Sequence, residues 1–189
     1  MWGPRLEGRV AVLRPVAEAE LTTVQAWFAD PVVLRFLEVP PFAVAPAQEK
    51  EWWEQAGSDK QSVLWGIESD GHIVGTTGIR HIDWMSRNGR TGTAIGDRSV
   101  WGRGIATEVM RLRAEYAFTQ LGLHKLVSSY FEGNAASAGA QRRCGYREVA
   151  RLRDELYREG RWHDRIVTEL LRDEWVAARQ SGEAGFSEG

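Results

Sequence analysis

Three strand-like runs, followed by a glycine-rich turn, a helix and a further strand, restrict the possible folds of this chain more than any other feature. The runs 63–68, 72–80 and 90–97 have the period of two typical of strands. Asp70-Gly71 is typical of a tight hairpin turn, and Asn88-Gly89 precedes the third run. We therefore expect an antiparallel meander. The helix expected at 105–121 and the β-rich run 125–131 then form a βαβ-like segment.

The remaining elements complete a mixed α+β fold. Further strands are expected at 10–15, 146–157 and 162–171, and helices at 18–28, 31–37, 47–57, 134–143 and 173–179. The proline-rich segment 39–46 cannot form regular helix, so we expect a loop there. The sequence thus predicts a mixed α/β sheet of about seven strands with helices on both faces. It forms a single domain over residues 1–180, and 181–189 is expected to be a disordered tail.

Charge and composition exclude several classes of function. The 24 basic and 26 acidic side chains leave a net charge of −2, so we expect no nucleic-acid partner. The single cysteine, Cys144, cannot form an internal disulfide, and no Cys/His set has the spacing of zinc ligands. We therefore expect no metal and a reducing, cytoplasmic location. No apolar run reaches the length of a membrane span, so no membrane partner is expected.

The segment Trp101-Gly102-Arg103-Gly104-Ile105-Ala106 joins a strand to a helix. Glycines let the backbone approach a ligand closely, and the free N–H groups at a helix start favour phosphate, although a tight turn alone would explain the same residues. A P-loop is excluded because no Lys-Ser or Lys-Thr follows the last glycine. A dinucleotide site fits Gly102-x-Gly104 and Glu132, but Thr107 stands where the third glycine belongs.

The run from Ile95 to Glu108, Ile-Gly-Asp-Arg-Ser-Val-Trp-Gly-Arg-Gly-Ile-Ala-Thr-Glu, resembles the acetyl-coenzyme A signature of the GNAT N-acetyltransferases. The likeness is to the ribosomal-protein-alanine and spermidine acetyltransferase branch. It continues through 116–118, 121–125, Asn134, 144–146, 157–164 and 171–175, and covers residues 9–175. It implies a GNAT-like, mostly antiparallel sheet in which the parallel strands 90–97 and 125–131 splay apart. It also implies transfer of an acetyl group from acetyl-coenzyme A to a primary amine of a small molecule or a protein N-terminus, and homodimers are common in this branch.

The resemblance places the cosubstrate between the splayed strands. Its pantetheine arm is expected to pair with the backbone near Ile95 and Asp97, and Asn134 belongs to the same binding motif. The pyrophosphate is expected on the backbone amides of Gly102, Arg103, Gly104, Ile105, Ala106 and Thr107. Trp101 replaces the Gln or Arg that is usual in this motif, but the phosphate contacts are made by the backbone.

Two positions depart from the family's catalytic pattern. Gln141 replaces the Tyr that protonates the leaving thiolate in many relatives, and an amide cannot supply that proton. Ala94 stands where the family often carries a Glu base. Ser137, which follows Asn134 at the spacing of some relatives, is expected to assist the thiolate, although a serine capping a helix start would look the same. A coenzyme A-binding sensor that has lost catalysis therefore remains an alternative.

The base and the acceptor pocket are less defined. His81 and Asp83 alternate to one face at the end of the second meander strand and are candidates for the base, but a solvated strand end needs no function. Aromatic walls can accommodate apolar or cationic groups, and the resemblance adds a His-Asp pair in the last hairpin. The residues expected to line the acceptor pocket are Trp27, Trp84, His163 and Asp164.

Overall fold

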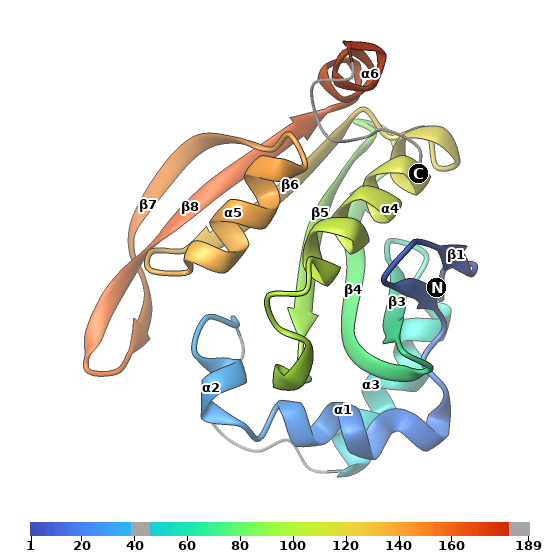
Figure 1. Ribbon diagram of the computed structural model, residues 1–189, viewed down its shortest axis with the longest axis vertical. Coiled ribbons are helices and arrows are strands. Elements are labelled where there is room, and N and C mark those ends of the chain that lie inside the picture. The colour runs from blue at the N-terminus through green and yellow to red at the C-terminus, as the bar shows by residue number, and fades with distance from the viewer. Residues whose placement is uncertain (39–45, 182–189) are drawn as a thin grey trace.

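The computed structural model describes residues 1–38 and 46–181, which build one eight-stranded sheet (Figure 1). The strand order is β1-β2-β3-β4-β5-β6-β8-β7, and each neighbouring pair is antiparallel except β5 and β6. The segment 39–45 and the tail from 182, for which a loop and disorder are expected, lie outside the described residues. The strands are β1 (Leu6–Glu7), β2 (Val12–Arg14), β3 (Val63–Ser69), β4 (His72–Asp83), β5 (Asn88–Ile95), β6 (Lys125–Phe131), β7 (Arg147–Arg158) and β8 (Arg161–Leu171).

The helices occur where the apolar period predicts them, within a few residues at their ends, except the short 3₁₀ helix η2 (Arg98–Val100), which was not predicted. They are η1 (Glu18–Glu20), α1 (Leu21–Trp27), α2 (Pro31–Leu34), α3 (Pro46–Ser58), η2 (Arg98–Val100), α4 (Ile105–Thr119), α5 (Ala135–Arg143) and α6 (Arg172–Ser181). Strand β1 was missed because a two-residue strand has no measurable period. Among the described helices, none is long and apolar enough to cross a membrane.

The turn between β4 and β5 differs from expectation. Residues 84–87 form it, and Asn88-Gly89 are the first residues of β5. The carboxylate of Asp83 accepts hydrogen bonds from the amides of Met85 and Ser86, both at 2.9 Å, which fixes the turn at this earlier position. At the other end, Asp97 is not in the strand but caps η2.

Helices cover both faces of the sheet, as predicted. On one face, α4, α5 and α6 pack over a main core that includes Trp65, Val109 and Phe118. On the other face, α1 packs over a smaller core of Val16, Leu21, Val24 and Ile73. Alternate residues of β3 therefore enter different cores, since Trp65 points to α4 while the neighbouring Gly66 lies against Val16.

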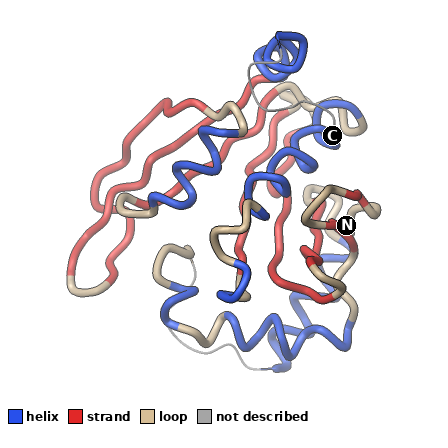
Figure 2. Tube along the Cα trace, in the orientation of Figure 1, coloured by secondary structure: helices blue, strands red, loops and turns tan. Residues whose placement is uncertain are grey.

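The parallel strands β5 and β6 splay apart after a short contact. They pair only at Asn88↔Lys125, Gly89↔Leu126 and Arg90↔Val127, although both strands continue beyond that point. Figure 1 shows them side by side near the top of the view and diverging below. The loop that leads into α4 lies beside the free end of β5 (Figure 2). The splayed parallel pair of a GNAT-like sheet is confirmed.

Candidate functional site

A cavity of about 370 Å³ lies where β5 and β6 separate. Residues 91–94 of β5 and 129–131 of β6 form its sides. Asn134 and Ser137 reach it from the α5 face of the sheet. Its lining on the side of α1 and α2 includes Phe28, Phe36, Leu37, Glu38, Leu64, Gly78 and Arg80. The cavity therefore passes through the sheet, so two ligands entering from opposite faces can meet in it.

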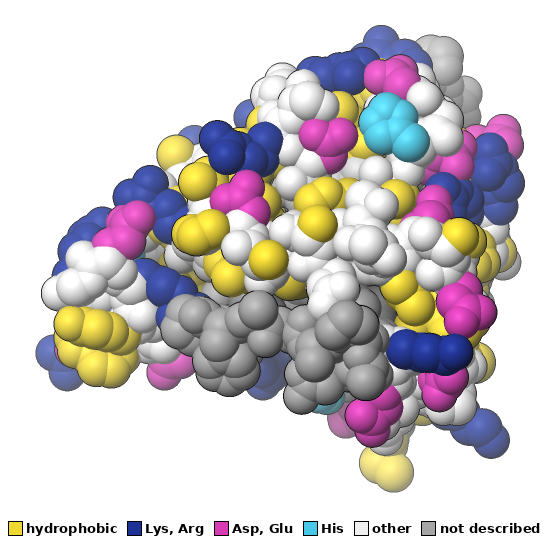
Figure 3. All heavy atoms as spheres, turned by 90° about the horizontal axis from the view of Figure 1, so that it is seen from below, with side chains coloured by type: hydrophobic (Ala, Val, Ile, Leu, Met, Phe, Trp, Pro, Cys, Tyr) yellow, Lys and Arg dark blue, Asp and Glu magenta, His cyan; other side chains and the backbone are white. Residues whose placement is uncertain are grey.

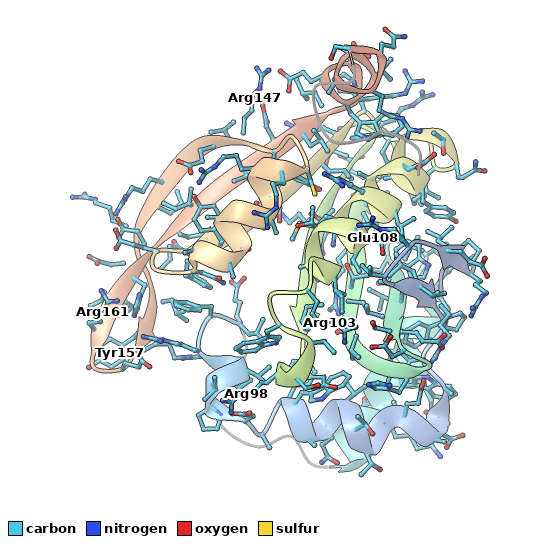
Figure 4. All side chains as sticks on the ribbon, in the orientation of Figure 1. Arg98, Arg103, Glu108, Arg147, Tyr157 and Arg161 are labelled. Atoms are coloured by element: carbon cyan, nitrogen blue, oxygen red, sulfur yellow. The ribbon has the colours of Figure 1, made fainter. Side chains whose placement is uncertain are left out.

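The loop before α4 presents its backbone to solvent. Gly102 and Gly104 have φ of +79° and +82°, a left-handed conformation that residues with a Cβ rarely adopt, and no atom lies within 4 Å of a Cβ built on either. Gly104 is the N-cap of α4, and the first N–H groups of a helix lack partners inside it. Arg103 points its guanidinium away to pair with Asp70 at 2.9 Å (Figure 4). We therefore expect Arg103 to contribute only its backbone amide to pyrophosphate binding.

At the end of β5, one of the two expected pantetheine contacts is already occupied. The amides of Gly96 and Asp97 both donate to the Val74 carbonyl, at 2.9 and 3.0 Å, so the Asp97 N–H is not available to a ligand. The Ile95 carbonyl accepts a 3.0 Å hydrogen bond from the indole of Trp101. Trp101 thus anchors the loop to the strand, a role that its departure from the usual motif did not indicate.

Ser137 is oriented by the buried side chain of Gln141, whose amide nitrogen and oxygen both form hydrogen bonds. The Gln141 amide nitrogen donates to the Ser129 carbonyl at 3.2 Å and to Ser137 Oγ at 3.1 Å, while its oxygen accepts from Thr168. Because the carbonyl can only accept, it fixes the orientation of the amide. Ser137 Oγ is therefore an acceptor from Gln141, and its own proton is free to be donated into the cavity. The helix cap is Asn134, whose side chain accepts from the Ser137 amide at 3.1 Å.

The candidate bases are not brought to the cavity. His81 and Asp83 lie at the end of β4 beside the closed end of the splayed pair, because Asp83 pairs with Asn88 and Asn88 with Lys125. They do not alternate regularly, since His81 has φ of +50° and the register shifts there. Trp84 is in the adjoining turn, where its indole donates to the Lys60 carbonyl. None of the three is a lining residue of the cavity.

The other expected acceptor residues lie behind the cavity or outside it. The Trp27 ring packs on Gly96, where a Cβ would come within 2.0 Å of it. His163 is buried behind Phe36, which lines the cavity, and the two rings meet edge to face at 6.4 Å. Asp164 pairs with Arg151 on the surface, and this bond holds the pKa of Asp164 below its usual value. Phe28 and Phe36 supply the aromatic walls instead.

A buried cation under the cavity was missed. Arg113 of α4 is fully buried and donates from Nη1 to Thr77 Oγ1, the Gly92 carbonyl and Thr93 Oγ1, at 2.7–2.9 Å. It has no ion pair among the described residues, and its Nε and Nη2 atoms have no hydrogen-bond partner there. The sequence signal was a charge one turn after Val109, inside an apolar stripe.

Few groups in the cavity change charge near neutral pH. The Arg165 guanidinium bonds to Glu38 and holds the pKa of that carboxyl below its usual range. Desolvation, together with a hydrogen bond to Glu148, raises the pKa of Tyr130 to about 12. Burial raises the pKa of the Cys144 thiol, which lies in the main core, to about 11 and keeps it protonated. No described lining residue thus has the properties of a base for neutral pH.

Comparison with known proteins identifies similar sequences and folds. The Acetyltransferase (GNAT) domain matches residues 11–147. The "Putative ribosomal N-acetyltransferase YdaF" of Bacillus subtilis is 30% identical over 123 residues, 65% of this chain and 67% of that protein. The L-methionine sulfoximine/L-methionine sulfone acetyltransferase of Pseudomonas aeruginosa is 27% identical over 172 residues, 86% of this chain and 95% of that protein. The spermidine N-acetyltransferase from Vibrio cholerae, solved with CoA and spermine, shares the fold with a TM-score of 0.81 at 18% identity, over 88% of this chain and 98% of that chain.

Proposed function

This chain belongs to the GNAT acetyltransferase family and is an N-acetyltransferase that uses acetyl-coenzyme A, and we propose that it transfers the acetyl group directly to the primary amine of a small molecule or a protein N-terminus. The observation that carries this proposal is the cavity through the sheet, open to α5 on one side and to α1 and α2 on the other. Two of the relatives are named as acetyltransferases of spermidine and of methionine sulfone, and both of these substrates are amines. These names support an amine acceptor for this chain.

The loop and the splayed strands are suited to hold the cosubstrate. Gly102 and Gly104 leave open space in front of the first turn of α4, where amides and the helix dipole favour the pyrophosphate. The gap between β5 and β6 leaves backbone groups of both strands without a strand partner, and the pantetheine arm would extend along β5 toward Arg90. The thioester would then lie in the cavity next to Ser137.

Ser137 and Arg113 would stabilise the negative charge that develops during transfer. Attack by an amine places charge first on the thioester oxygen and then on the departing sulfur. Ser137 can donate its hydroxyl proton as a hydrogen bond to that sulfur, because Gln141 already occupies its acceptor side. Arg113 lies behind Thr93 and Gly92, where a buried positive charge acts at low dielectric.

The amine would enter the cavity already neutral. Glu38, the carboxylate among the described lining residues, is bonded to Arg165 and is therefore a weak base. A proton released by the amine after attack would pass to solvent through the open side of the cavity. The absence of a family-type Glu at Ala94 is consistent with this arrangement.

The single thiol of the chain suggests a reducing compartment.

The outer surface suggests a homodimer. Strand β7 is an edge of the sheet and exposes Val149 and Leu152. Hydrophobic side chains gather at the free end of the β7–β8 hairpin, at left in Figure 3, where Tyr157 and Trp162 are about half exposed and stack at 5.2 Å. Light scattering on the purified chain, with Trp162→Ser as comparison, tests this association.

The function is tested by combining binding and turnover. Calorimetry with coenzyme A tests the cosubstrate site, and release of free thiol tests transfer to amines, amino acids and N-terminal peptides. We expect micromolar or tighter binding and acetyl-amine product identified by mass. Binding without thiol release for any amine between pH 6 and 10 would favour a sensor instead. Gln141→Tyr does not distinguish the two, because Gln141 is bonded to Ser129, Ser137 and Thr168 and a ring cannot replace it there.

A further inference from the structure

Two arginines that have no ion pair among the described residues face each other beside the cavity. Arg80 of β4 and Arg90 of β5 are direct cross-strand neighbours, so both side chains leave the sheet on the same face. Like charges in this arrangement destabilise a sheet. Within the described part of the chain, neither forms a hydrogen bond or an ion pair. A pair of this kind is a natural site for an anion that the protein itself does not supply.

The arginine pair lies at the point where the strands begin to separate. Arg90 is in the last residue pair between β5 and β6, and Arg80 lines the cavity. The next pair along the same face is Gly78↔Gly92. No atom lies within 4 Å of a Cβ built on Gly92, so the floor is open there, whereas Leu64 covers Gly78. Gly92 is about 7 Å from Arg90 along the strand, within the reach of an arginine side chain. An anion held by Arg80 and Arg90 would thus lie within the length of a small molecule from the reacting amine.

Two acids lie near this pair, but no ion pair joins either of them to Arg80 or Arg90. Glu38 is bonded to Arg165 at 2.9 Å, although it also attracts Arg90. Asp59 attracts Arg80 from the turn before β3, but its carboxylate accepts from Gln61. Arg80 and Arg90 are both exposed, although partial loss of surrounding water lowers the pKa of Arg80 in spite of that attraction.

Among the described residues, arginines without an ion pair therefore lie on both sides of the sheet at the cavity. Arg113 adds a further unpaired cation below the floor, as described above. A polyamine acceptor would bring additional charges of the same sign into this field. An acceptor with a negative group near its amine would remove the repulsion between the arginines.

We propose that the acceptor carries a carboxylate next to its primary amine, as an α-amino acid does, and that Arg80 and Arg90 bind that carboxylate. This inference rests on the proposed function and specifies the substrate of the same site. Two guanidinium groups match the two oxygens of a carboxylate. Phe28, Phe36 and Leu64 line the same side of the cavity and would receive an apolar side chain. Binding in this way leaves the amine directed toward the gap between β5 and β6.

The test compares each acid with its own amide. Acetylation of L-methionine, L-phenylalanine and L-leucine is measured beside acetylation of their α-amides, which have the same amine and side chain without the carboxylate. The amides have more acidic ammonium groups, so kcat/KM is compared at the high-pH limit, where both amines are neutral. We expect the acids to be preferred by at least about 10-fold, as charged hydrogen bonds contribute in other sites.

Variants test whether Arg80 and Arg90 cause the preference for acids over amides. Arg80→Gln and Arg90→Gln are each expected to raise KM for the acids about 10- to 100-fold while changing KM for the amides little. Both should keep or raise the melting temperature, because each removes the repulsion within the pair. Arg161→Gln, at the exposed tip of the β7–β8 hairpin (Figure 4), makes the same charge change away from the cavity and should alter neither value.

The outcomes separate this inference from the proposed function. Equal use of acids and amides by the unchanged protein, or equal loss of both in Arg80→Gln, would overturn the carboxylate site while the transferase function stands. If no amino acid is turned over, calorimetry with N-acetyl-L-methionine and its amide in the presence of coenzyme A decides. Tighter binding of the acid that is lost in Arg80→Gln supports the site, and equal or absent binding refutes it. Thiol release with any other amine judges the proposed function independently.

Discussion

Gly104 offers a prediction with an internal control. We expect Gly104→Val to weaken coenzyme A binding, because the new side chain would occupy the space in front of the first turn of α4. Gly160, at the turn of the β7–β8 hairpin, has φ of +76° against +82° at Gly104, and no atom lies within 4 Å of a Cβ built on either residue. Gly160→Val therefore introduces the same backbone strain at a distance from the loop.

The similar backbone conformations of Gly104 and Gly160 allow the expected losses of stability and of affinity to be estimated separately. A residue with a Cβ in the left-handed region costs about 1–2 kcal/mol, so both variants should melt about 2–8 °C below the unchanged protein. Loss of one charged hydrogen bond to the pyrophosphate costs about 1.5–3 kcal/mol, which is about 10- to 150-fold in affinity. We expect this loss in Gly104→Val and unchanged affinity in Gly160→Val.

Calorimetry with coenzyme A and a thermal melt measure the two effects separately. If both variants lose stability equally but Gly104→Val binds coenzyme A normally, the pyrophosphate does not lie on this loop. If both lose affinity equally, the effect comes from reduced stability and the assignment has no support. Desulfo-coenzyme A, which retains the pyrophosphate, should show the same difference between the two variants.

Three further predictions concern the chemistry and the framework. Ser137→Ala should lower kcat about 10- to 100-fold with KM for acetyl-coenzyme A nearly unchanged, because Gln141 keeps its bond to Ser129. The control is Ser58→Ala at the exposed end of α3, where the hydroxyl donates to the Gln55 carbonyl, and full kcat in Ser137→Ala would return Ser137 to packing. The logarithm of kcat/KM should rise with pH up to the pKa of the acceptor amine and move with that pKa between acceptors; a fixed inflection near pH 6–7 for all acceptors would reveal a protein base. The carboxylate of Glu108 accepts hydrogen bonds from the amides of Arg9, Val10 and Ala11 at 2.7–2.8 Å. Glu108→Ala should therefore lower the free energy of unfolding, measured in urea, by about 2–3 kcal/mol, and Glu108→Gln should lower it by less. Equal losses in the two variants would contradict this role of Glu108.

The sequence predicts those elements whose signals are local. Asp70-Gly71 forms the expected turn with φ of +52° and +82°, and Gly145 ends its helix in the left-handed conformation. The glycine loop was also found, because its glycines and the helix start lie within a few residues. The interaction of Ser137 with Gln141 spans one helical turn, but its meaning depends on Ser129 and Thr168 from two other strands. A one-dimensional pattern does not contain that arrangement.

The arginine pair shows why register limits such predictions. A two-residue turn at Asn88-Gly89 would pair Arg87 with Arg90 and, counting outward, Arg80 with Asp97, an attractive pair that needs no ligand. The carboxylate of Asp83 instead accepts the amides of Met85 and Ser86, moves the turn to residues 84–87 and sets Arg80 opposite Arg90. A change of a few residues in one turn thus replaces an internal ion pair with two arginines that have no ion pair among the described residues. Asp83, expected as a base, influences the site through the register of β4 and β5, and Asp83→Ala should therefore disturb the acceptor side of the cavity before it disturbs binding of coenzyme A.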